Sequence, residues 1–254
     1  MTCVRADTLQ IVPAASDVGK FNRCRRVACS MKLGLELHKD ELDQLPGGGK
    51  MILAAACTQR HSMNYHTFAG GKGSRRSKQF DAILDAIWRD IGYDQLSTDQ
   101  LEKLRLRAER LHPDEGPYAG YAGLAVEALI ICCVAARLHG DSTHVLYIAH
   151  RAFETIWGFL PEVHSTWRTD DGFLAPDADE KFAAHPLARD EHLRQERDLN
   201  DVTRMVKERC SIVDIVEHLE KRSKAESKAE ALIPIRSGMP IDLTTVKLEK
   251  RPRR

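Results

Sequence analysis

Apolar residues recur with the period of an α-helix along most of the chain. Within 80–91 they follow at intervals of three and four positions, which places them on one stripe of a helix. The same spacing recurs in 35–45, 145–160 and 186–219. No stretch alternates apolar and polar residues over a useful length, which is the pattern of a half-buried strand. The sequence therefore predicts an all-α fold, with helix over most of 35–219.

Helix breakers divide this pattern into separate elements. Pro46 with Gly47–Gly49 closes the first short helix, and Pro161 stops a later one. Ser97-Thr98-Asp99-Gln100 has the composition of a capping box and predicts a helix start. We expect a further break near Cys210, between the last two helices.

One run is apolar on all sides, from Tyr118 to Leu138. A membrane span needs about 18 or more residues nearly free of charge, and Glu127 interrupts this run. We therefore interpret it as the central buried hydrophobic helix of a single-domain multi-helix bundle, and we expect no membrane contact. We expect six large apolar residues to be buried in one core: Ile87, Trp88, Leu129, Ile130, Phe153 and Trp157.

Glu127 is informative because a carboxylate inside an apolar helix is costly unless it is paired or hydrogen-bonded. We expect a partner from the neighbourhood of Arg137, from a tyrosine hydroxyl or from a histidine on a packed helix. One interpretation, which we favour, is a structural buried pair. The other is an acid that faces a ligand in a cavity of the bundle.

The two ends of the chain differ from the middle. Residues 1–30 show no periodicity, and we interpret them as a non-native or unstructured extension, so that a chain beginning at Met31 keeps full stability. The helical domain is expected over 31–222. Residues 223–254 are basic and interrupted by proline and glycine, and we expect them to be unstructured.

The formal charge of +1 hides an asymmetry, because residues 31–220 carry 23 basic and 31 acidic side chains while both ends are basic. An acidic body suits a basic protein partner and disfavours nucleic acid, except through the basic tail. The candidate partner-binding residues lie in polar segments outside the expected core: Asp114, Glu115, Asp170, Asp171, Asp177, Asp179 and Glu180.

Motifs that carry catalysis or bind cofactors are not found. The seven cysteines are irregularly placed and indicate a reducing cytoplasm rather than a disulfide scaffold. Neither Gly47–Lys50 nor Gly71–Gly73 follows a strand, as a phosphate-binding loop requires. The histidines lack the one-turn spacing of helical metal sites, and we interpret His185 and Arg189–His192 as part of a solvated face. We predict no catalytic, cofactor-binding or metal-binding residues.

Four segments together resemble a known family, the YjaG-like proteins of domain of unknown function 416. They are KMILAAACTQRHSMNYHTF, FDAILDAIWRDI, YAGYAGLAVEALIICCVAARL and HPLARDEHLRQERDL, within Leu35–Leu219. The resemblance implies an all-helical bacterial cytoplasmic protein, and some relatives are thought to be immunity proteins that neutralise toxins. It thus favours a non-enzymatic protein-binding module whose partner is a basic toxin. The alternative is an enzyme or small-ligand binder with a cavity near Glu127, and the oligomeric state stays open.

Overall fold

The computed structural model describes residues 33–71, 73–114, 119–163, 165–169 and 173–227. The expectations for residues 1–30 and for the tail beyond 227 lie outside these described residues.

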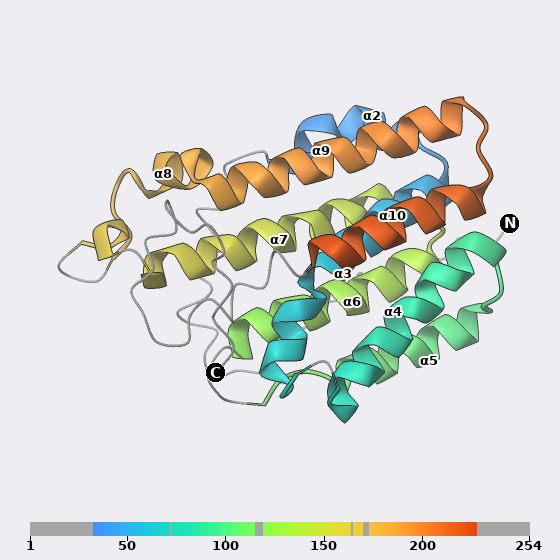
Figure 1. The fold of residues 1–254 in the computed structure, drawn as a ribbon, viewed down its shortest axis with the longest axis horizontal. Helices are drawn as coiled ribbons and strands as arrows, with labels where there is room; N and C mark the ends of the chain where they lie inside the picture. The colour runs from blue at the N-terminus through green and yellow to red at the C-terminus, as the bar shows by residue number, and fades with distance from the viewer. Residues whose placement is uncertain (1–32, 72, 115–118, 164, 170–172, 228–254) are drawn as a thin grey trace, which may run out of the picture. The chain divides into compact units, whose positions relative to one another are not determined.

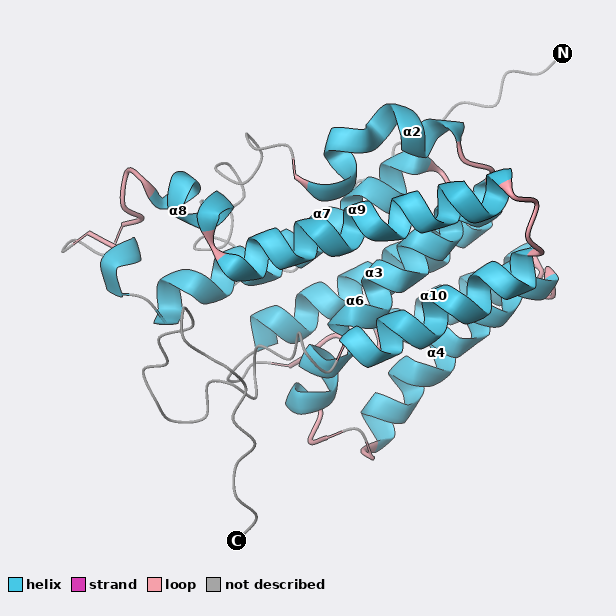
Figure 2. Cartoon of the chain, turned by 45° about the horizontal axis from the view of Figure 1, so that its top comes forward, coloured by secondary structure: helices cyan, strands magenta, loops and turns pink. Residues whose placement is uncertain are grey.

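The described chain is helical throughout, as Figures 1 and 2 show. The elements in order are η1 (Gly34–His38), α2 (Lys39–Gln44), α3 (Gly47–Phe68), α4 (Arg75–Tyr93), α5 (Thr98–Glu109), α6 (Ala119–Arg137), α7 (Ser142–Val163), η2 (Ser165–Trp167), α8 (Ala178–Ala184), α9 (Pro186–Lys207) and α10 (Ile212–Glu226). The described residues contain no strand, only one isolated antiparallel bridge between Arg168 and Leu174. The predicted all-α bundle is confirmed.

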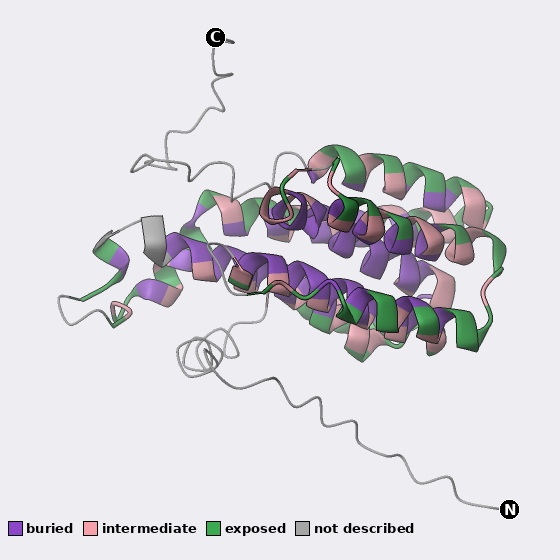
Figure 3. Ribbon diagram, turned by 90° about the horizontal axis from the view of Figure 1, so that it is seen from below, coloured by how far each residue is buried: buried purple, intermediate pink, exposed green. Residues whose placement is uncertain are grey.

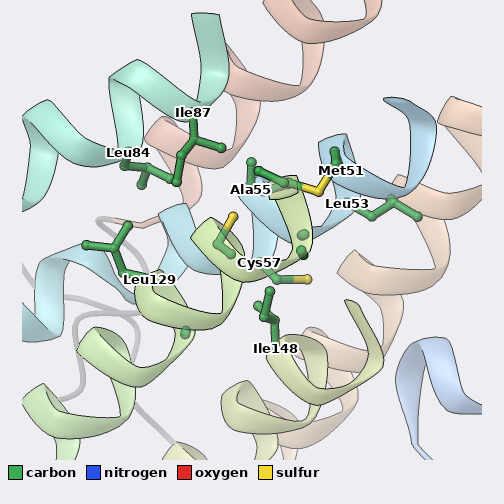
Figure 4. Packing of buried hydrophobic residues seen from close by; sticks show 14 of the residues in the cluster. Met51, Leu53, Ala55, Cys57, Leu84, Ile87, Leu129 and Ile148 are labelled. Atoms are coloured by element: carbon green, nitrogen blue, oxygen red, sulfur yellow. The ribbon is translucent and has the colours of Figure 1, made fainter. Parts of the chain in front are cut away.

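Two helices form the centre of the bundle. α6 packs against α3, α5 and α7, while α3 packs against α4, α6, α7, α9 and α10. Twelve of the 19 residues of α6 are buried, as predicted, but α3 is buried still more completely, at 16 of 22. Figure 3 shows the buried residues along the inner sides of the helices, and Figure 4 shows core side chains that come from α3, α4, α6 and α7.

The apolar composition of α6 has a structural explanation. By length and composition alone this helix could cross a membrane, but 56% of its most apolar window is buried within the fold. Along its middle, the half-exposed residues Gly123, Glu127, Ile131 and Val134 follow one another at helical spacing. α6 therefore presents one narrow outer stripe rather than an apolar surface on all sides.

The expected single core is divided in two. Ile87, Trp88, Leu129 and Ile130 belong to the main core, but Phe153 and Trp157, although buried, lie outside it. The ring of Trp157 meets those of Phe182 and Trp167 edge to face, with centroids 4.8 and 6.3 Å apart. The end of α7 thus has its own aromatic cluster, which η2 and α8 complete.

Glycines 47–49 begin a helix instead of ending one. They form the first turn of α3, and Pro46 is its N-cap. A Cβ on Gly47 would lie 2.2 Å from the carbonyl oxygen of His139, so this turn approaches the α6–α7 connection at backbone distance. The expected stop at Pro161 is also wrong by two residues, since α7 continues to Val163. The capping box at Ser97 and the break at Cys210–Ser211 are confirmed.

Candidate functional site

The second half of α3 is polar and yet enclosed by the other helices. Its buried polar side chains are Thr58, Gln59, Arg60, His61, Ser62, Asn64 and His66. Buried polar groups cost free energy unless they find hydrogen bonds or opposite charges. The groups that satisfy this half of α3 therefore define the most unusual part of the interior.

Arg60 is the centre of this region. Its side chain is 1% exposed, and Nη1 lies 2.6 Å from Oδ2 of Asp198 while Nη2 lies 3.2 Å from Oε1 of Glu191. Nη2 also donates to Sγ of Cys57, one turn earlier on α3, at 3.3 Å. One buried guanidinium thus pairs with two buried carboxylates from another helix.

The two carboxylates lie on one stripe of α9 together with a buried amide. Glu191, Gln195 and Asp198 follow at i, i+4 and i+7, so their side chains share the face that meets α3. Nε2 of Gln195 donates to Oε1 of Glu191 at 2.6 Å and to the carbonyl oxygen of Ala149 at 3.0 Å. Oε1 of Gln195 accepts from the backbone N–H of Leu35 at 3.1 Å, so this amide joins α9 to α7 and η1.

α10 closes the same cluster from a third side. Arg222 of α10 contacts Oδ1 of Asp198 at 2.7 Å and Oδ2 of Asp201 at 2.5 Å. Glu226 pairs with Arg197, and its other oxygen lies 3.8 Å from Nη1 of Arg60. We call the linked side chains the Arg60 cluster: Arg60, Glu191, Gln195, Arg197, Asp198, Asp201, Arg222 and Glu226. It connects α3, α9 and α10 by alternating charges.

This arrangement corrects the interpretation of Arg189–His192 as a solvated face. Arg189 and Asp190 are exposed, but Glu191 is 1% exposed and His185 is also buried. Conversely, Leu193, which the apolar pattern places on the inner face, is 56% exposed. The spacing of Glu191, Gln195 and Asp198, in register with buried Leu199 and Val202, is the signal that could have identified the inner stripe.

His61 lies beside this cluster and is 3% exposed. Burial lowers its pKa to about 3, and the positive charges of Arg60 and Arg151 add to this effect. Nε2 of His61 is buried without a hydrogen-bond partner among the described residues. With its pKa lowered this far, His61 is neutral over the physiological pH range, which does not favour acid–base catalysis by this side chain.

Glu127 has a partner, but not the environment that we expected. One carboxylate oxygen lies 3.0 Å from Nη2 of Arg151 on α7, and the Glu127 side chain is 39% exposed. Arg151 also pairs with Glu154, and its guanidinium lies 4.1 Å from the ring centroid of Tyr147. The expectation of a buried acid is wrong, because Glu127 occupies the outer stripe of α6.

The structure describes four of the seven acidic candidates, Asp114, Asp177, Asp179 and Glu180. Asp114 is exposed and pairs with Arg76 at 3.1 Å, while Asp177 pairs with Lys181 at 2.9 Å. Glu180 is exposed and Asp179 is half-buried, both in the first turn of α8. Glu115, Asp170 and Asp171 lie outside the described residues.

Burial also suppresses the reactivity of two thiols on α6. It raises the pKa of the Cys132 thiol to about 12 and raises that of Cys133 well above its usual value. A thiol is nucleophilic only as the thiolate, so neither cysteine is activated. Over the described ranges of the chain, no three His, Cys, Asp or Glu side chains are grouped to hold a metal ion.

Comparison with known proteins identifies the family of the chain. The family model described as protein of unknown function, DUF416, matches residues 37–228. The chain belongs to the DUF416 family. This DUF416 protein is also similar to the crystal structure of a DUF416 family protein from Shewanella baltica OS155, with a TM-score of 0.60 and 19% identity over 73% of this chain and 92% of the other. At that identity the likeness shows the fold alone. No curated protein matches the chain.

Proposed function

We propose that this DUF416 protein is a non-enzymatic module that binds another protein. The observation that supports this is the Arg60 cluster, in which charged side chains of α3, α9 and α10 pair with one another. Arg60 meets its two carboxylates within 3.2 Å, and Gln195 uses both ends of its amide in the same network. A buried network with its members engaged in this way fixes the positions of helices. It therefore acts as a scaffold for a recognition surface.

Three other buried ionisable groups support the same proposal. His61 stays uncharged at neutral pH, and burial keeps Cys132 and Cys133 as thiols. Catalytic acids, bases and nucleophiles have pKa values matched to the working pH, and these three groups are shifted away from it.

A finer version of the proposal is that the module neutralises a basic toxin in the bacterial cytoplasm. The acidic positions offered to that partner would be Asp114, Asp177 and Glu180, which are exposed. Charge complementarity of this kind raises the rate of encounter and weakens as salt increases. Because Asp114 and Asp177 already have cations beside them, the partner would have to displace Arg76 and Lys181.

The test is capture of partner proteins from cells that encode the native gene neighbours. The site variant carries Asp114→Asn, Asp177→Asn and Glu180→Gln. The control variant removes the same charge at exposed positions elsewhere, with Glu36→Gln, Asp40→Asn and Glu217→Gln. We expect a specific partner to be lost from the site variant and retained by the control. Equal capture by both variants, at low and high salt alike, contradicts the basic-partner version.

The alternative, a small-ligand site beside Glu127, has one specific observation in its favour. Arg151 holds a guanidinium that is 8% exposed between Glu127 and Glu154, next to the exposed ring of Tyr147. If the capture experiment yields no protein and a metabolite co-purifies instead, this alternative takes precedence. Loss of that metabolite in Glu127→Gln, with the fold intact, would then assign it to this surface.

A further inference from the structure

The outer surface of α5 has a regular composition of its own. Lys103, Leu106, Arg107 and Arg110 follow at i, i+3, i+4 and i+7, and all four are exposed. On the opposite side of the helix, Leu101, Leu104 and Ala108 are buried, where α5 packs against α6. We call the four exposed residues the α5 stripe. It is a continuous ridge of three cations around one leucine.

The charge of the α5 stripe is not compensated within the part of the chain that the structure describes. Lys103, Arg107 and Arg110 each lack an ion-pair partner there, whereas both glutamates of α5 are engaged by Arg105. Arg105 lowers the pKa of Glu102, which also pairs with Arg137 of α6. Asp99, one turn before Lys103, is an exposed carboxylate that makes no ion pair among the described residues. The three cations of the stripe outnumber it, so a net positive potential is available to a partner.

The start of the neighbouring helix is also basic. Arg75 and Lys78 are exposed in the first turn of α4, which contains no acidic residue. Cations at the N-terminal end of a helix add to the positive end of its dipole and weaken the helix, so local stability does not explain them. Figure 1 shows α4 and α5 side by side, and the Arg76–Asp114 pair joins the start of α4 to the segment that follows α5.

We propose that the α5 stripe docks an acidic amphipathic segment of a partner protein. This inference rests on the proposed protein-binding function and identifies the surface that would carry it out. Charge complementarity with the stripe requires an acidic partner. The net negative charge of residues 31–220 suggests a basic partner instead, so the local charge and the overall charge favour partners of opposite sign. Leu106 favours a protein over the phosphate backbone of a nucleic acid as the partner of the stripe. It is 42% exposed among the three cations, and an apolar centre with a charged rim is the anatomy of a protein interface.

The composition of the α5 stripe fits this role in two further respects. Arginine is enriched at the positions that dominate binding energy in protein interfaces, and the stripe supplies two. The ends of this chain do not match the stripe, because residues 1–30 and 221–254 both carry net positive charge and are repelled by it. A separate acidic segment is therefore the complementary occupant.

The test uses two labelled helical peptides of about 18 residues, or five helical turns. Both have leucine on one face, and the other face carries glutamate in one peptide and lysine in the other. Fluorescence anisotropy with the full chain measures their affinities, with circular dichroism to confirm that each variant folds. We expect the glutamate peptide to bind and the lysine peptide not to bind. We also expect Lys103→Gln, Arg107→Gln, Arg110→Gln to weaken binding about tenfold or more.

Two controls separate docking from general attraction. Arg189→Gln, Lys207→Gln, Lys221→Gln removes three exposed cations elsewhere and should change the affinity by less than about twofold. Leu106→Asn keeps the full charge of the stripe and should still weaken binding severalfold. A glutamate peptide that fails to bind, or that binds both triple variants equally well, overturns the inference. Binding of the lysine peptide that depends on Asp177 and Glu180 overturns it too, while leaving the proposed function in place.

Discussion

Arg60 of α3 and Asp198 of α9 lie 138 positions apart in the chain, yet Nη1 and Oδ2 are 2.6 Å apart and both side chains are almost fully buried. Taking two charges out of water costs several kcal/mol each, which their mutual attraction must offset. The pair is therefore sensitive to the loss of either member.

The first prediction follows from this sensitivity. Arg60→Met removes the buried guanidinium that contacts both Glu191 and Asp198, and leaves Asp198 with Arg222 alone. We expect it to lower the free energy of unfolding by about 3–5 kcal/mol. Urea denaturation followed by circular dichroism measures the change. The triple variant Arg60→Met, Glu191→Gln, Asp198→Asn removes the charges together and should recover much of the loss. A triple variant as unstable as the single one contradicts the electrostatic explanation.

A second prediction concerns pH. In the folded chain the pKa of His61 is lowered to about 3, mainly by burial and then by Arg60 and Arg151, from an ordinary value of 6.5. Below pH 6.5 the unfolded chain takes up a proton here that the folded chain does not. Stability is therefore lost as the pH falls from 6.5 toward 3, with a loss of about 2 kcal/mol between pH 7 and pH 5.

His61→Gln isolates this contribution. Without the imidazole, the unfolded chain no longer gains a proton at this position, so the variant should lose less stability between pH 7 and pH 5 than the natural chain. Thermal denaturation at both pH values measures the difference. Parallel pH profiles for the two proteins would show that His61 is protonated in the folded state.

Periodicity predicted those helices that bury a plain apolar stripe. In α4, Phe80, Ile83, Leu84, Ile87 and Trp88 fall at helical spacing, and all five are buried in the main core. Local sequence contains the whole of that signal, because a single helix determines which of its residues share a face. The capping box at Ser97 was predictable for the same reason, since its two hydrogen bonds join residues three positions apart.

The polar half of the interior could not be predicted in this way. Glu191 and Asp198 resemble surface residues until Arg60 is placed beside them, and that contact depends on the packing of α3 against α9. For Glu127 the error has the opposite direction, because the sequence suggests burial and the side chain is partly exposed. An apolar run of this length suggests complete burial, but the stripe of α6 that contains Glu127 faces outward. Tertiary packing decided both positions. The spacing of Glu191 and Asp198 with Leu199 and Val202 marks their face of α9, but it does not identify the cation that pairs with them.

A third prediction tests the close approach of two turns. A Cβ on Gly47 would lie 2.2 Å from the carbonyl oxygen of His139, and one on Gly140 would lie 2.4 Å from that of Gly47. Gly140 also has φ near +80°, which other residues rarely adopt. We expect Gly47→Ala and Gly140→Ala to destabilise the fold by about 1–3 kcal/mol each. Gly92→Ala is the control: no atom lies within 4 Å, and it should stabilise α4 by up to about 1 kcal/mol.

The last prediction distinguishes the cysteines by their environment. Burial raises the pKa of Cys132 to about 12 and keeps Cys133 protonated as well, while Cys210, between α9 and α10, is half-exposed. Because alkylation requires the thiolate and access to it, we expect Cys210 to react with iodoacetamide at pH 8 at least about a hundredfold faster than Cys132 and Cys133. Mass spectrometry of peptides after timed labelling gives each rate, and labelling in denaturant should make all three comparable. Fast labelling of Cys132 in the native chain would mean that α6 separates from α3 often enough to expose the core. The packing of these two central helices would then be transient.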